Sequence, residues 1–170
     1  MADTIQITAR IRPSVHAAIV ELAKQDTSHV VPQQTGDYIA SVLTRVALES
    51  NYMDLDEEER IRAEEEVLRL AQWKAVELRD NGRFDEHFTL TVIRAMMQDP
   101  DIRRTYETAV GGDAYTDGLK GKMPLNMYLG WSIKNAVGAE VQKNETGKPR
   151  RTTVRGEPIQ TYTLLDPNSV

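Results

Sequence analysis

Residues 150–165, RRTTVRGEPIQTYTLL, decide how the C-terminal half of the chain is expected to fold. The runs RRTTVR and IQTYTLL are rich in Thr, Val, Ile and Tyr, and they flank GEP, whose glycine and proline favour a turn. The stretch therefore predicts a β-hairpin. Alternation along the first run predicts one set of side chains facing inward (Thr152, Val154) and the other facing outward (Arg151, Thr153, Arg155).

Helices are predicted in the segments that precede this hairpin. Asp99 is expected to be the N-cap and Pro100 a first-turn residue of one helix, which Gly111 ends. A helix over 84–97 is expected before it, and another over 124–141 after it. The apolar face of the last helix is expected to comprise Leu125, Leu129, Ile133, Ala136 and Val137.

A long acidic helix is predicted over residues 55–80. Asp54 or Asp56 is expected to cap it, and Asn81 with Gly82 ends it. The segment 54–86 holds 12 acidic and 6 basic residues, so it is more acidic than the whole chain, whose net charge is −5.

The first residues of the chain have a different pattern. Residues 4–11, TIQITARI, alternate apolar and polar side chains and predict a half-buried strand. Pro13 stops that strand and opens a helix over 14–25. After a loop, Thr35 is expected to cap a second helix.

The expected fold class is therefore mainly α, with a short N-terminal strand and a C-terminal β-hairpin. Three parts are expected along the chain. They are a module at 1–53, a long acidic connecting helix at 54–86, and a helical domain with the hairpin at 87–170.

The N-terminal order of strand, proline, helix, loop and capped helix resembles the ribbon-helix-helix family of DNA-binding proteins. The resemblance rests on TIQITARI, Pro13, the helical stripe through Leu22, and TGDYIASVLTRVAL at 35–48. It implies a dimer in which two copies pair their strands and the polar face enters the major groove. It also implies that Gln6, Thr8 and Arg10 read bases, side chains able to bond base edges, and that Thr35 holds a phosphate. An ordinary edge strand packed on two helices is the alternative.

The C-terminal order of helices followed by a hairpin looks like a winged helix. LNMYLGWSIKNAVGAEV, residues 125–141, would be the recognition helix, and the hairpin would be the wing. Residues 120–155 hold 8 basic and 2 acidic residues, a pattern typical of phosphate contact, although a solvated basic face explains it as well. The expected phosphate-binding residues are Lys134, Lys148, Arg150, Arg151 and Arg155. Trp131 and Tyr162 are expected to be core aromatics rather than stacking platforms for bases.

Several kinds of chemistry are not indicated by the sequence. The chain has no cysteine, and its three histidines (His16, His29, His87) lie far apart without metal-ligand spacing. An exposed turn explains His87 beside its acidic neighbours. We therefore expect no catalytic residues, no metal and no cofactor, and so no enzyme. No apolar run is long enough to span a membrane and no secretory signal is recognisable, so a cytoplasmic protein without membrane contact is expected.

These patterns predict a non-enzymatic protein that binds duplex DNA, such as a dimeric regulator from a phage, plasmid or other mobile element. The homodimer is expected to form through residues 4–11. The alternative is a protein-binding subunit, either an antitoxin-like inhibitor or a small component of a nucleoprotein complex, that meets its partner through the acidic helix at 54–86.

Overall fold

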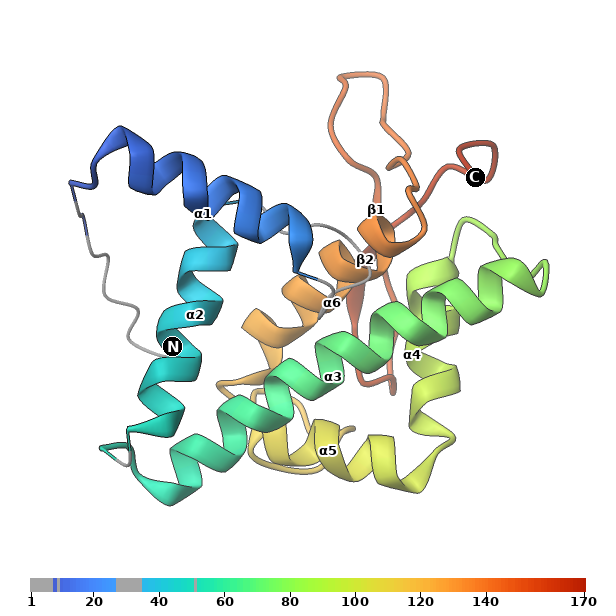
Figure 1. Ribbon diagram of the computed structural model, residues 1–170. Helices are drawn as coiled ribbons and strands as arrows, with labels where there is room; N and C mark the ends of the chain where they lie inside the picture. Colours follow the sequence, from blue (N-terminus) through green and yellow to red (C-terminus); the bar gives the residue numbers. More distant parts are fainter. Residues whose placement is uncertain (1–7, 9, 27–34, 51) are drawn as a thin grey trace. The chain divides into compact units, whose positions relative to one another are not determined.

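The computed structural model describes residues 8, 10–26, 35–50 and 52–170. The described chain is mainly α-helical, with six helices and one two-stranded antiparallel hairpin, as the sequence predicts (Figure 1). It separates into two compact units, Met1–Glu58 and Glu59–Val170. The three-part division expected from the sequence stays a prediction.

The first unit contains two helices that pack on each other, α1 (Pro13–Gln25) and α2 (Thr35–Glu49). Pro13 lies in the first turn of α1, where its missing N–H costs no hydrogen bond. Ala23 of α1 and Leu48 of α2 are buried.

The strand expected at residues 4–11 is not present in the described part of this segment. Thr8, Arg10 and Ile11 have irregular backbone, and residues 4–7 and 9 lie outside the described residues. A strand needs a neighbour for its amides and carbonyls, and the two strands of the described chain pair with each other instead.

Helix α3 (Leu55–Asp80) has the expected length and ends. Asp54 caps it, since its carboxylate accepts a hydrogen bond from the Asp56 amide at 3.0 Å. Gly82 adopts φ +69° and ends the helix, while the amide of Arg83 donates to the Leu78 carbonyl. One side of α3 is buried along most of the helix (Ala63, Val67, Ala71, Gln72, Ala75, Leu78).

The remaining elements of the second unit are three helices and the hairpin: α4 (Phe88–Met97), α5 (Pro100–Val110), α6 (Lys122–Ala136), β1 (Arg151–Thr153) and β2 (Thr161–Thr163). Helices α4 and α6 contact each other, and both contact α5 and β2, so this pair lies at the centre of the contacts among these elements. The largest fully buried side chains include Phe88, Ile93, Met96, Tyr106, Leu129, Ile133, Ile159 and Leu165. The five residues expected on the apolar face of α6 are all buried, which confirms that prediction.

Three predicted helix ends differ from the structure: α6 begins at Lys122 rather than at residue 124, and two larger differences are explained by local turns. Helix α4 begins at Phe88 rather than at residue 84, because the Asp85 side chain accepts from the His87 amide at 2.8 Å and fixes a turn there. Helix α6 ends at Ala136 rather than at residue 141. Gly138 follows with φ +68°, and the Ala139 amide donates back to the Lys134 carbonyl.

Candidate nucleic-acid interface

The predicted hairpin is confirmed, and its strands pair Arg151 with Thr163, Thr152 with Tyr162 and Thr153 with Thr161. A third segment, 141–143, joins it through isolated bridges that pair Val141 with Leu165 and Lys143 with Pro149. Backbone hydrogen bonds of 2.8–2.9 Å link Gln142, Arg150 and Leu164 across the three segments. We use the name basic hairpin for residues 141–155, which comprise this third segment, the loop that follows it and the first run of the predicted hairpin. The name does not include β2. In Figure 1 the orange loop between α6 and β1 stands away from the helices of the second unit.

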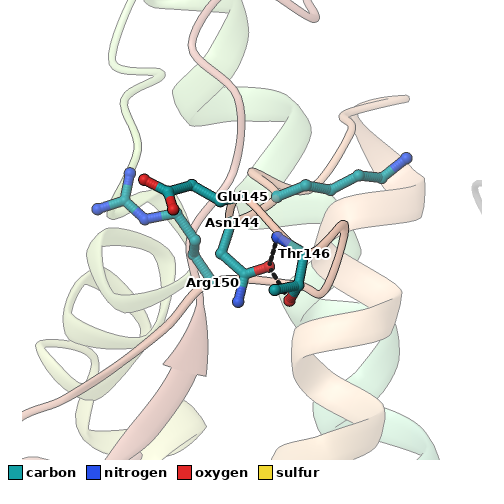
Figure 2. Close-up of a pocket in the computed structure, with 5 residues that line it drawn as sticks. Asn144, Glu145, Thr146 and Arg150 are labelled. Carbon is teal, nitrogen blue, oxygen red and sulfur yellow. Dashed lines mark hydrogen bonds between the residues drawn. The ribbon is translucent and has the colours of Figure 1, made fainter.

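The tip of the basic hairpin is organised by Asn144. Its Oδ1 accepts hydrogen bonds from the Thr146 amide at 3.0 Å, the Thr146 hydroxyl at 2.8 Å and the Lys148 amide at 2.9 Å. Figure 2 shows Asn144 turned toward Thr146, while Glu145 and Arg150 extend together toward the other side of the loop. These residues and Lys143 line an open hollow of about 460 Å³. The tip therefore presents side chains from a fixed backbone.

The basic side chains of this hairpin differ from those of α3, α4 and α5 in their partners. On α3, α4 and α5, cations are held in ion pairs, among them Arg69 with Glu66 and Arg94 with Glu157. No ion pair with any described residue is formed by the five cations of the hairpin: Lys143, Lys148, Arg150, Arg151 and Arg155. All five are exposed. The predicted alternation is also confirmed, because Thr152 and Val154 are half-buried between exposed neighbours.

Hydrogen bonds fix the base of the hairpin to the start of α4. Glu86 accepts from Gln142 Nε2 at 3.1 Å, and Gln142 Oε1 accepts from the Arg150 guanidinium at 2.8 Å. Arg150 is thus oriented through Gln142, a role that no sequence pattern indicated. Lys143 was visible in the sequence only as one charge of the basic block.

Of the predictions made for His87, Tyr162 and Trp131, the first two are confirmed and the third is wrong. Tyr162 is buried as expected; burial raises its pKa, and its hydroxyl lies 3.0 Å from Nδ1 of His87. His87 stands in an exposed turn, as expected, with Nε2 3.3 Å from Glu86. The prediction for Trp131 was wrong, since 51% of this residue is exposed. Trp131 lies off the stripe of Leu125, Leu129 and Ile133 that packs inward, so the helical spacing placed the buried face correctly and the aromatic type of Trp131 misled the prediction.

The other expected site residues lie outside the basic hairpin, some in the first unit and one in the second. Lys134 is half-buried near the end of α6. Thr35 is the first residue of α2, and the residue before it lies outside the described part, so its capping role stays a prediction. Thr8 and Arg10 are exposed, whereas Gln6 lies outside the described residues.

The comparisons with protein-family models, curated proteins and solved structures give no match for this chain. Among the described residues, no three His, Asp or Glu side chains gather in a way that could hold a metal ion. Within the same residues, each helix is too short or too polar to cross a membrane.

Proposed function

We propose that this protein binds duplex DNA and that the basic hairpin is its contact with the phosphate backbone. The observation that carries the proposal is the set of five exposed cations without ion-pair partners among the described residues. An ion pair must be given up before a cation can meet a phosphate, so unpaired cations bind anions at the lowest cost. The order α4, α5, α6, β1, β2 supports the resemblance to a winged helix.

The contact is expected to position the protein rather than to read sequence. Long side chains on a projecting hairpin reach phosphate oxygens, and contacts of that kind carry no base information. Lys148, Arg150, Arg151 and Arg155 neutralise about four phosphates in this arrangement, which gives a log–log salt slope of about −3.6 on duplex DNA. Base reading is assigned to the N-terminal unit, where the exposed Thr8 and Arg10, together with Gln6, would act in a dimer paired through residues 4–11.

A protein-binding subunit is the second candidate. The first turns of α3 carry exposed acidic side chains, including Asp56, Glu59 and Glu65. Such a surface suits a basic partner. The salt dependence of binding to random duplex DNA separates the two functions, because a protein-binding subunit alone shows little DNA binding and no steep slope.

The decisive experiment replaces both Arg151 and Arg155 by alanine. The variant should flatten the salt slope by nearly two units and keep its sequence preference, because two phosphate contacts are lost. The matched control replaces Arg69 and Arg104, which are exposed but paired with Glu66 and Asp101. That control should keep the slope. An unchanged slope in the Arg151/Arg155 variant would remove the basis of the proposal.

A further inference from the structure

The basic hairpin carries one carboxylate among its five cations. Glu145 is the only acidic residue of 141–155, and its exposed side chain forms no ion pair or hydrogen bond with any described residue. A free carboxylate on a phosphate-binding surface repels the phosphates that its neighbours attract. A surface that met only the DNA backbone would bind more tightly without it. The carboxylate therefore suits a ligand that offers hydrogen-bond donors as well as phosphates.

Glu145 and Arg150 lie on the same side of the hairpin tip. Both line the open hollow of about 460 Å³, and Figure 2 shows the two side chains extending in the same direction, away from Thr146. Neither forms an ion pair with the other or with any other described residue. The hollow therefore presents a hydrogen-bond acceptor, the carboxylate, and a hydrogen-bond donor, the guanidinium, to one ligand.

Hydrogen bonds hold both of these groups in place in the free protein. Asn144 Oδ1 accepts from the Thr146 amide at 3.0 Å and so fixes the backbone on either side of Glu145. Gln142 Oε1 accepts from one terminal nitrogen of Arg150 at 2.8 Å, which leaves the other terminal nitrogen and Nε without a bond to any described residue. Because the guanidinium is a planar fork, fixing one nitrogen orients the remaining donors. Groups held in this way give up little conformational freedom on binding.

We propose that Glu145 and Arg150 together read a G·C base pair in the major groove of duplex DNA. Guanine presents two adjacent acceptors there, N7 and O6, for the free edge of a guanidinium, and cytosine presents its N4 amino group as a donor to a carboxylate. An A·T pair places its donor between two acceptors, so it offers the guanidinium no adjacent pair. The groove admits a two-stranded β-ribbon, and the loop that carries these side chains stands away from the helices of the second unit (Figure 1).

Base reading by this pair rests on the proposed binding of duplex DNA and changes one part of it. Arg150 contacts a base instead of a phosphate. The phosphate contacts then fall to the other four cations of the basic hairpin, Lys143, Lys148, Arg151 and Arg155. About four phosphates are again neutralised, so the expected salt slope keeps its value of about −3.6. The hairpin thus contributes one base pair to the recognised site, in addition to the bases assigned to the first unit.

Selection from random duplex DNA, followed by affinity measurements, tests the role of Glu145. The wild type should enrich a G·C pair at one position, and Glu145→Ala should lose that preference alone. The variant should bind the selected duplex about 5–150-fold more weakly, the cost of one mismatched base pair. It should bind a duplex with A·T at that position more tightly than the wild type does, because a charge that repels phosphates is gone.

Glu140→Ala is the matched control for the loss of a negative charge. Glu140 is exposed and forms no ion pair with a described residue, but it does not line the hollow. Its replacement should change the affinity for the two duplexes by the same factor. The melting curves of both variants should match the wild type, because the substituted side chains are exposed.

A guanine analogue tests the role of Arg150. 7-Deazaguanine replaces the N7 acceptor by a C–H group and still pairs with cytosine, so the wild type should bind the substituted duplex more weakly, whereas Arg150→Ala should bind both duplexes alike. If Glu145→Ala binds both the G·C and the A·T duplex more tightly, or if the analogue leaves wild-type affinity unchanged, base reading is overturned and DNA binding by the hairpin still stands. If the wild type binds no duplex DNA, the proposed function and base reading both fail.

Discussion

Replacement of Asn144 by alanine should loosen the tip of the basic hairpin without unfolding the protein. The substitution removes the Oδ1 acceptor of three hydrogen bonds, from the Thr146 amide, the Thr146 hydroxyl and the Lys148 amide. These groups are exposed, so water replaces the lost acceptor in part, and we expect a net local cost of about 1–2 kcal/mol. Such a cost corresponds to about a 5–30-fold change in an opening equilibrium.

Native-state hydrogen exchange measures this opening directly. The amides of Thr146 and Lys148 should exchange about 5–30-fold faster in Asn144→Ala, because they open locally rather than with the whole domain. Core amides, such as those of α4, should keep their rates, and the melting temperature should hardly change. Affinity for duplex DNA should fall modestly, since the tip must then be ordered on binding.

Asn144→Asp is the matched control, because a carboxylate keeps the acceptor and adds one negative charge. The two amides should stay protected in this variant, while DNA binding weakens through repulsion of phosphates. If Asn144→Ala leaves both exchange rates at the wild-type value, the side chain does not organise the tip and the reasoning fails.

Two further predictions concern the body of the second unit. Burial raises the pKa of Tyr106 to about 12, above its ordinary value of 10, so the unfolded chain releases this proton first. The free energy of unfolding should then fall by about 2–3 kcal/mol as pH rises from 10 to 12, and Tyr106→Phe should remove that part of the pH dependence in urea titrations. Gly121→Ala should destabilise the fold by about 1–3 kcal/mol, because the new Cβ would lie 3.3 Å from the backbone of Ala109 and Val110; an unchanged denaturation midpoint would show that this backbone moves away freely.

Local signals made much of the fold predictable. Helix α5 shows this best, because Asp99 accepts from two amides of the first turn, Pro100 follows it, and Gly111 ends the helix in a left-handed conformation. Each of these features depends on residues close in sequence. The buried face of α6 followed from spacing for the same reason.

The parts that were missed depend on contacts between residues far apart in sequence. Segment 141–143 joins the hairpin through backbone bonds to Arg150, Leu164 and Leu165, and no periodic pattern announces such a short piece. Arg94 pairs with Glu157, 63 residues away, so counting charges along the chain did not reveal which cations are neutralised. The candidate site was therefore predictable as a basic block, but the ion pairs that neutralise the cations of α3, α4 and α5 were not.

Ion pairing on the helices fits the proposed binding of DNA by a protein of negative net charge. The chain carries a net charge of −5, which opposes contact with DNA over most of its surface. Screening limits each charge to a range of about 10 Å at ordinary ionic strength, so the potential near a phosphate is set by local charges. In the second unit several acidic side chains of α3 and α5, among them Glu66 and Glu107, are paired with neighbouring cations, here Arg69 and Arg103. The basic hairpin keeps its cations unpaired and holds them away from those helices. Its orientation on DNA is therefore expected to be restricted, because one surface attracts phosphates while the acidic remainder is repelled.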